Sequence, residues 1–242
     1  MIFFKFNSWF EKMLVFIILM LYLCFLYIDF FNIRSFISVD YIKFTCTLLC
    51  FCLSFSYSAD NKKGFLLLHI ALLFTLISDF IILILDNNSL GVTTFCITHI
   101  LYSVRHDYNN YKKTLIYFLS VFLTIALLFL IGIGLRKNVD YLTFISLFYF
   151  LCLLTNVFKS LKAYREDLFS NPKKIFIAAG VILFFLCDIN VGLYNITGFS
   201  QLNTYTLRAL HRIGYILMWF FYLPSQLLLA SSEKETLTQP AK

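Results

Sequence analysis

The sequence lacks the short motifs that mark several large enzyme classes. It contains no G-x-x-x-x-G-K-S/T nucleotide loop, no H-E-x-x-H zinc motif and no G-x-S-x-G nucleophile turn. Its seven cysteines lie inside apolar runs, with no C-x-x-C spacing and no cluster of Cys and His. Standard nucleotide, zinc-protease and serine-hydrolase interpretations therefore have no support, and we expect no disulfide framework, no metal site and no cofactor.

Charged residues, glycine and proline are also scarce. Charged residues make up 14% of the chain, whereas 60% is hydrophobic and 30 residues are phenylalanine. Apolar runs long enough to cross a bilayer, about 17–25 residues each, recur along the whole chain. These runs do not alternate apolar and polar residues as barrel strands do. The sequence therefore predicts an all-α integral membrane protein, which we expect in the cell membrane.

Eight apolar runs are candidates for membrane spans. They cover residues 13–32, 40–58, 65–85, 92–106, 114–135, 141–159, 175–196 and 207–230. Together they predict a single eight-span domain over residues 1–230, followed by a polar, disordered tail over residues 231–242. The third and seventh spans share a similar frame, FTLISDFIILIL and LFFLCDINVGLY, which suggests a duplication into two four-helix repeats.

The basic residues are distributed unevenly between the two sides that eight alternating spans define. The side that contains Lys62, Lys112 and Lys174 has 14 of the 20 Lys and Arg residues, and the other side has 6. Since positive residues concentrate in cytoplasmic loops, both termini are predicted to be cytoplasmic. The net charge of +7 then reflects orientation and contact with anionic membrane lipid, and not nucleic-acid binding.

Two aspartates lie deep inside apolar spans, where insertion of a carboxylate costs about 2.5–3.5 kcal/mol or more. Asp79 is 14 residues into the third span and Asp188 is 13 residues into the seventh, so both lie about 20 Å from the cytoplasmic face. His99 enters from the opposite side and is nearly level with them. Such acids either join helices by polar contacts or form a buried pair for chemistry or proton movement. Their matching depth favours the buried pair.

Short signatures surround these polar residues. LLFTLISDFIILIL and FCITHILY contain Asp79, His99 and Tyr102, and LFFLCDINVGLY contains Asp188. The closing segment WFFYLPSQLLLAS contains Tyr222 and Gln226. In their order and spacing these segments resemble the signatures of the YhhN lysoplasmalogenase family, with the named residues on matching positions.

Lys43, in YIKFT, resembles the lysine of an early K-P-L motif of the same family. Four positions depart from the family pattern: Phe44, Thr98, Cys187 and Pro224. None of these departures removes an acidic residue.

The resemblance implies an eight-span hydrolase whose substrate is a lysophospholipid within membrane lipid. Such an enzyme cleaves the vinyl-ether bond of a lysoplasmalogen, giving a fatty aldehyde and a glycerophospho-ethanolamine or -choline. The residues assigned to catalysis are Asp79, Asp188 and His99. The residues assigned to substrate binding are Lys43, Ser78, Tyr102, Asn190, Tyr222 and Gln226. No protein partner is indicated.

Two other functions agree with the same sequence. Paired membrane carboxylates also form proton relays, so one alternative is a proton-coupled transporter. Transporters often contain helices broken by glycine or proline, and the chain has only 8 glycines and 3 prolines, which weakens that alternative. The other is a lipid-binding paralogue that has the fold but no catalytic activity.

Reporter fusions test the predicted orientation. Fusions after Lys242 and in the loop 159–174 should report a cytoplasmic location, because most basic residues lie on that side. Fusions at Asn88 and Asn138 should report an external location. An external C-terminus would contradict the eight-span prediction.

Overall fold

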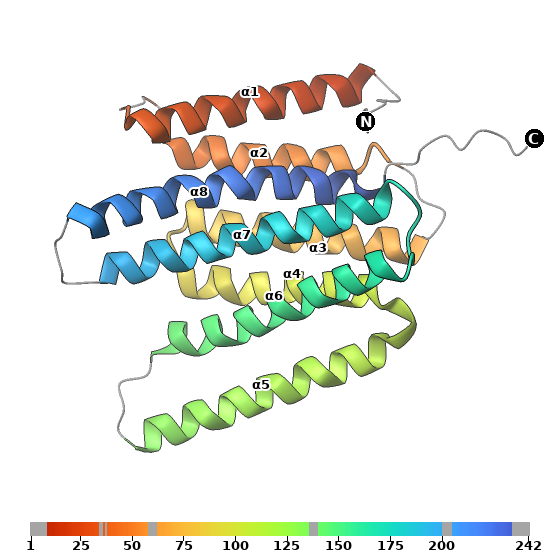
Figure 1. Cartoon of the computed structure of the whole chain (residues 1–242), viewed down its shortest axis with the longest axis vertical. Helices are drawn as coiled ribbons and strands as arrows, with labels where there is room; N and C mark the ends of the chain where they lie inside the picture. The colour runs from red at the N-terminus through yellow and green to blue at the C-terminus, as the bar shows by residue number, and fades with distance from the viewer. Residues whose placement is uncertain are drawn as a thin grey trace, which may run out of the picture. The chain divides into compact units, whose positions relative to one another are not determined.

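The computed structural model describes residues 9–33, 36, 38–57, 62–135, 140–199 and 205–233. These residues form helices and no strand (Figure 1). The α-helices are α1 (Trp9–Phe31), α2 (Val39–Ser54), α3 (Lys62–Leu83), α4 (Asn88–His106), α5 (Tyr111–Gly134), α6 (Tyr141–Arg165), α7 (Lys173–Phe199) and α8 (Tyr205–Ala230). Two short 3-10 helices, η1 (Tyr108–Asn110) and η2 (Ser231–Glu233), complete the described chain. The all-α prediction is therefore confirmed for these residues.

Six of the helices are long and apolar enough to cross a membrane. They are α1, α3, α5 together with η1, α6, α7, and α8 together with η2. This identifies a membrane protein. Helix α2 has 16 residues and is only about 24 Å long, shorter than a hydrocarbon layer of about 30 Å. Helix α4 contains Thr, Ser, His and Arg, which lower its hydropathy. The membrane crossings of α2 and α4 stay predictions.

Large apolar side chains cover the outer faces of α1 and α5. Phe16 and Leu23 of α1 and Leu123, Leu127 and Leu130 of α5 are all more than half exposed. In water such a surface would cause aggregation, whereas lipid tails are as apolar as these side chains. The exposed surface of the two helices is therefore suited to lipid.

The helices divide into two compact units. The first comprises α1, α2, α7, α8 and η2, from residues 1–58 and 170–242, and the second comprises α3 to α6 with η1, from residues 59–169. This division does not follow the two predicted repeats, which would pair the first four spans and the last four. The repeat and the single domain over residues 1–230 stay predictions.

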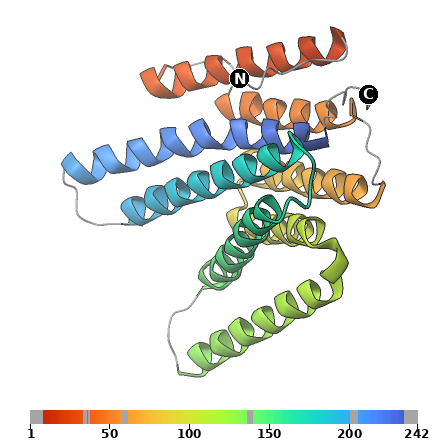
Figure 2. The same ribbon diagram turned by 45° about the vertical axis from the view of Figure 1, so that its right-hand side comes forward.

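Helix α8 is the centre of the first unit, where it packs against α1, α2 and α7. The axes of the four helices are nearly parallel (Figure 2), and α7 and α8 run in opposite directions. Helices α7 and α8 approach closely at Gly214, where a Cβ atom would lie 3.1 Å from the Asn190 carbonyl oxygen and the Tyr194 nitrogen. Farther along, the Ser225 hydroxyl donates a hydrogen bond to the Gly180 carbonyl at 2.8 Å. Small residues thus allow the two backbones to come together.

Four helix ends meet at one end of the first unit. Tyr57, just after α2, lies within hydrogen-bonding reach of Glu11 in α1 and Ser231 in η2. Lys173, the first residue of α7, forms an ion pair with Glu233. Both ends of the described chain therefore lie at the same end of this unit, as an even number of crossings requires.

The predicted disordered tail is wrong for its first three residues. Ser231, Ser232 and Glu233 form η2 and are buried. The pairing of Glu233 with Lys173 provides the physical reason, because a buried carboxylate with a cationic partner fixes the segment in place. Residues 234–242 lie outside the described residues.

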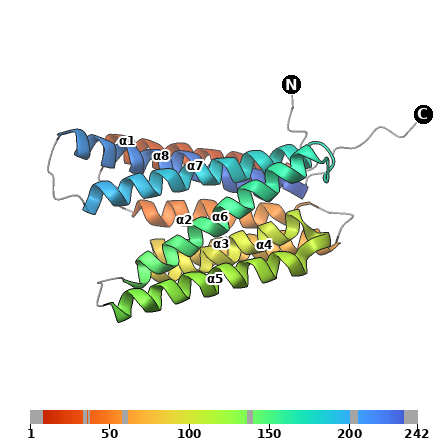
Figure 3. The ribbon, with the colours of Figure 1, turned by 60° about the horizontal axis from the view of Figure 1, so that its bottom comes forward.

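Helix α4 is the centre of the second unit, where it packs against α3, α5 and α6. Helix α6 runs obliquely to the other three (Figure 3). Between α5 and α6 lies an apolar cluster that includes Phe118, Ile125, Phe144 and Phe148. The buried polar side chains Asp79, His99 and Asn156 lie instead on α3, α4 and α6.

Pro224 lies inside α8 without interrupting it. Proline has no backbone N–H, so the carbonyl of Phe220, four residues earlier, loses its helical donor. The Tyr22 hydroxyl of α1 donates a hydrogen bond to this carbonyl at 2.8 Å. In lipid an unsatisfied carbonyl is costly, so the proline in α8 creates an attachment point for α1.

Tyr22→Phe removes this donor and should lower the free energy of unfolding by about 1–3 kcal/mol, because the Phe220 carbonyl is left unsatisfied. The measurement is a denaturant or thermal unfolding midpoint in detergent. The control is Tyr27→Phe, since Tyr27 is on the same helix and is 58% exposed. Equal midpoints for the two variants would contradict this interpretation of the Tyr22 contact.

Candidate functional site

The residues predicted to form the site belong to both units. The second unit contains Ser78, Asp79, His99 and Tyr102. The first unit contains Lys43, Asp188, Asn190, Tyr222 and Gln226.

Asp79 lies in α3, four residues before the helix ends, and is only 4% exposed. The preceding residue, Ser78, donates a hydrogen bond to the Thr94 hydroxyl of α4 at 2.7 Å, which sets the register of the two helices. His99 is five residues farther along α4, about 8 Å along its axis. Because α3 and α4 run in opposite directions, Asp79 and His99 lie on opposite sides of the Ser78–Thr94 contact, about 9 Å apart along the helix axes. Their common level in the membrane stays a prediction.

Ser78 was assigned to substrate binding, but its hydroxyl is used within the unit. Its oxygen lies 2.7 Å from both the Thr94 hydroxyl and the Phe74 carbonyl of its own helix, so its single proton is shared between these two acceptors. Its side chain is fully buried. In this structure Ser78 joins α3 to α4, and a substrate contact stays a prediction.

Both ring nitrogens of His99 have partners on α6. The Asn156 amide nitrogen lies 3.1 Å from Nδ1, and the Tyr149 hydroxyl lies 3.2 Å from Nε2. An amide nitrogen only donates, so Nδ1 accepts and the proton of a neutral imidazole resides on Nε2. His99 is also completely buried, which disfavours a second proton on the ring. The arrangement fixes both the tautomer and the orientation of the ring.

Tyr102 is fully buried one turn after His99. Its ring is stacked on that of His106, with centroids 6.3 Å apart, and its hydroxyl lies beside Thr75 of α3. Tyr102 therefore contributes to the contact between α3 and α4 at the end of α4 where the chain continues to Asp107.

Two of the basic residues that were counted in predicting the orientation of the chain are buried. Arg105 is 2% exposed and Lys43 is 1% exposed. Without them, 13 basic residues lie on the predicted cytoplasmic side and 5 on the other. The bias that supports cytoplasmic termini is therefore retained.

Asp188 lies in the middle of α7 and is partly buried. On its two sides, Phe184 contacts Tyr222 with ring centroids 5.6 Å apart, and the Asn190 carbonyl faces Gly214. Asp188 is thus level with the middle of the α8 segment between Gly214 and Tyr222. Both aspartates of the predicted pair are inside helices, each in its own unit.

The remaining predicted residues of the first unit differ in their contacts. Asn190 donates a hydrogen bond to the Leu186 carbonyl of its own helix at 2.8 Å, so its amide is used locally. Tyr222 is 5% exposed and packs edge-on against Phe184 and Trp219. Gln226 is completely buried, and within the described chain its amide has no hydrogen-bond partner. A buried amide without a partner is suited to a bound water or substrate group.

Lys43 does not lie at the surface, where it would extend to a phosphate or to water. Its ammonium is 2.9 Å from the Asp29 carboxylate of α1 and donates a hydrogen bond to the Tyr215 hydroxyl at 2.8 Å. The rings of Trp219, Tyr215 and Phe25 surround it, with centroids 4.4, 4.6 and 5.8 Å away. Lys43 is therefore buried and paired, and its charge is neutralised within the first unit.

Sequence reasoning missed the partners of these residues. Asp29 lies two residues before the end of α1, and Tyr149 and Asn156 lie on α6. One signal was available for Asp29, because Phe25 and Asp29 are four residues apart and share a helix face. For Tyr149 no pattern in the sequence indicated a contact with His99.

A cavity of about 430 Å³ in the second unit contains none of the predicted residues. It is lined by Asp107, Asn110, Lys113, Thr114, Tyr117, Thr155 and Lys159. Burial raises the pKa of Asp107, but hydrogen bonds from Lys159 and Asn110 outweigh this effect and hold the pKa below its ordinary value. No group of three or more His, Cys, Asp and Glu side chains in the described chain is arranged to hold a metal ion.

Removing one member of the buried pair should destabilise the protein strongly. Asp29→Asn or Lys43→Gln alone leaves a buried charge without its partner and should lower the free energy of unfolding by about 3–5 kcal/mol. The double variant removes both charges and should cost less than the sum of the two. The control is Lys112→Gln, because Lys112 is exposed. An unchanged unfolding midpoint for Lys43→Gln would contradict the buried pairing.

Comparison with known proteins identifies the family. No curated protein and no solved structure matches the chain. The family model of the YhhN family matches residues 40–233, a range that contains every residue assigned to the site. The chain therefore belongs to the YhhN family.

Proposed function

We propose that the protein is a hydrolase of the cell membrane that cleaves the vinyl-ether bond of lysoplasmalogens. One observation carries the proposal: the YhhN match extends over residues 40–233 and includes both intramembrane aspartates, Asp79 and Asp188. The apolar helices support it further, because a single-chain lipid can place its tail between them. No cofactor takes part in the proposed reaction.

The chemistry requires an acid and a base. Protonation of the vinyl-ether double bond at the carbon remote from oxygen gives an oxocarbenium ion. Water adds to this ion and loses a proton, which forms a hemiacetal. The hemiacetal then breaks its bond to the glycerol oxygen, releasing a fatty aldehyde and a glycerophospho-ethanolamine or -choline. The net reaction consumes one water molecule, and the catalytic proton is returned.

Two carboxylates supply both functions when they share one proton. In a site of low polarity the neutral form of an aspartic acid is favoured, and a second carboxylate nearby opposes ionisation further. The protonated member donates to the double bond. The ionised member stabilises the oxocarbenium ion and takes the proton of the attacking water. We assign these functions to Asp79 and Asp188 as a pair, without dividing them between the two residues.

His99 is assigned to orienting groups in the site. Because Asn156 and Tyr149 occupy its ring nitrogens, His99 is held neutral and in one orientation. We expect a neutral, fixed imidazole in the same unit as Asp79 to influence which carboxylate retains the proton. The proposal therefore expects His99→Ala to lower turnover without abolishing substrate binding.

Asp79→Asn and Asp188→Asn should each reduce aldehyde release from lysoplasmalogen by about 10²–10⁴-fold, because an amide neither donates the required proton nor carries the anion. The assay uses purified protein in detergent, with the unfolding midpoint as a check on folding. Asp86→Asn is the matched control, since Asp86 is exposed, lies between α3 and α4, and has a φ of 51° that asparagine tolerates. Near-normal turnover in either variant would remove that aspartate from the mechanism.

A saturated substrate analogue separates the hydrolase from its alternatives. An alkyl-lysophospholipid has no double bond to protonate, so it should inhibit aldehyde release without being cleaved. A transporter would instead move an ion or solute across liposome membranes in response to a pH gradient. A paralogue that only binds lipid would bind the analogue and the substrate equally and release no aldehyde. Either result would refute the hydrolase.

A further inference from the structure

The surroundings of Lys43 have the composition of an ammonium-binding site. One carboxylate, from Asp29, and three aromatic rings, from Phe25, Tyr215 and Trp219, enclose its ammonium group. Aromatic rings attract cations through their electron-rich faces, and ring cages of this kind recognise alkylated ammonium groups. The chain's own lysine fills the site in this structure.

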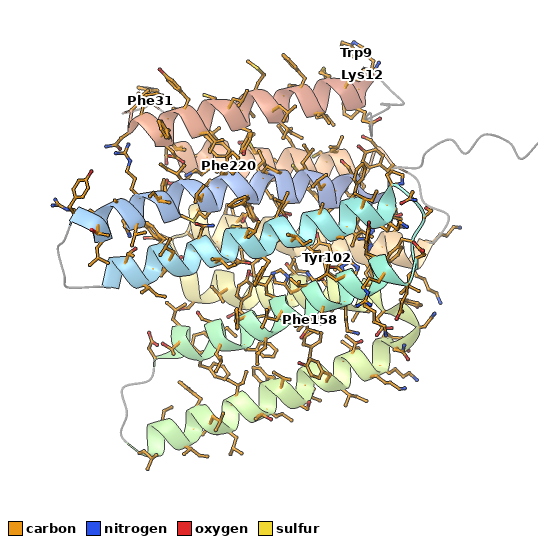
Figure 4. The ribbon with its side chains drawn as sticks, viewed as in Figure 1. Trp9, Lys12, Phe31, Tyr102, Phe158 and Phe220 are labelled. Carbon is orange, nitrogen blue, oxygen red and sulfur yellow. The ribbon has the colours of Figure 1, made fainter. Side chains whose placement is uncertain are left out.

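The site lies near the helix ends of the first unit. Asp29 is two residues before Phe31, the last residue of α1, which Figure 4 shows at the opposite end of the helix from Trp9. Lys43 is four residues after the start of α2, about 6 Å along its axis. In a bilayer the polar head groups lie at the ends of the spans. The Lys43 ammonium therefore lies close to the depth of lipid head groups.

A second cation is available on the same helix as two of the rings. Arg212 is one turn before Tyr215 on α8 and is exposed, and its guanidinium donates to the Phe30 carbonyl at 2.7 Å. A guanidinium has five N–H donors, so one such bond leaves donors for an anion. The end of the first unit thus combines one buried carboxylate with two basic side chains.

We propose that Asp29, Phe25, Tyr215 and Trp219 bind the ammonium of a zwitterionic phospholipid head group, whose phosphate binds the released Lys43. In the empty protein Asp29 and Lys43 neutralise each other. In the complex the lipid ammonium takes the place of the Lys43 ammonium, and the lipid phosphate takes the place of the Asp29 carboxylate as the partner of Lys43. The proposal rests on the proposed function, because the lipid held here is the substrate of that reaction.

The exchange is favoured by charge pairing. A head group with one phosphate and one ammonium matches the two buried charges of the site, Lys43 and Asp29, so both of these charges stay paired before and after binding. A purely anionic lipid pairs with Lys43 but leaves Asp29 buried without a cation. A purely cationic lipid pairs with Asp29 and leaves Lys43 without its partner. Since an unpaired buried charge is strongly unfavourable, the site selects the zwitterion.

Trp219 reports directly on the exchange. The chain has two tryptophans, and Trp9→Phe leaves Trp219 as the single one; Trp9 is 77% exposed, so its replacement disturbs little. The protein in maltoside micelles is titrated with three ligands that share a dodecyl tail: dodecylphosphocholine, dodecyl phosphate and dodecyltrimethylammonium. Dodecylphosphocholine should change Trp219 fluorescence in a saturable way and bind at least about tenfold more tightly than the other two. Equal binding of the three ligands, or saturation without a change at Trp219, would overturn the proposal.

Asp29→Asn, made in the same single-tryptophan background, should change the ligand preference in a direction that a purely structural role does not produce. Dodecylphosphocholine should bind at least about tenfold more weakly, because its ammonium loses the carboxylate. Dodecyl phosphate should bind more tightly than to the parent, because Lys43 is no longer neutralised. The matched control, Asp86→Asn, should leave all three affinities unchanged. A parallel weakening of all three ligands would assign Asp29 to the fold and reject it as the ammonium partner.

None of the three ligands contains a vinyl ether, so their binding does not depend on catalysis. Loss of the zwitterion preference together with normal aldehyde release would reject this site and leave the proposed hydrolase intact. The zwitterion preference without aldehyde release would reject the hydrolase and retain the head-group site.

Discussion

The absence of water from the bilayer interior is the constraint on which the structure depends. Each ion and each polar backbone group placed there needs a partner within the protein. The buried ammonium of Lys43, toward the head-group end of the first unit, is paired with Asp29. Deeper in α8, the Phe220 carbonyl that Pro224 leaves without a helical donor accepts from Tyr22. These contacts connect α1 to α2 and α8, whose other surfaces are largely apolar. Polar groups that are few in number therefore determine which helices become neighbours.

Close helix packing around each aspartate suits the proposed chemistry. In each unit the aspartate lies on one helix of a closely packed pair, α3 with α4 or α7 with α8. Near both acids a glycine lets the backbones approach: Gly91 faces Ile82, three residues after Asp79, and Gly214 faces Asn190, two residues after Asp188. A helix pair fixed so close to an acid leaves its backbone little freedom. Such rigidity suits a carboxylic acid whose proton must be directed at one carbon atom.

Composition and the length of the apolar runs were sufficient to predict the helical class and the membrane setting. The family was indicated by the resemblance of short segments around Asp79, His99 and Asp188 to its signatures. The apolar runs also indicated which residues are costly to bury, among them Asp79 and Lys43. They did not indicate the partners of those residues. Asp29 meets Lys43, and Tyr149 meets His99, only after helices pack, and one apolar helix face resembles another in a sequence rich in Phe and Leu. A lysine near a helix end ordinarily extends outward to water, but Lys43 is held inside by a carboxylate and three aromatic rings that no pattern in the sequence places beside it.

The first unit is assembled from the two ends of the chain, and in the sequence all of the second unit separates these two segments. During synthesis α1 and α2 therefore leave the ribosome long before α7 and α8 exist. Asp29 and Lys43 belong to this first hairpin, and only a short loop separates their helices. The hairpin thus brings its own counter-charge, and the pair can enter the bilayer as a neutral unit while Tyr215 and Trp219 are still untranslated. The order in which the ribosome delivers the helices is matched by the order in which their charges become paired.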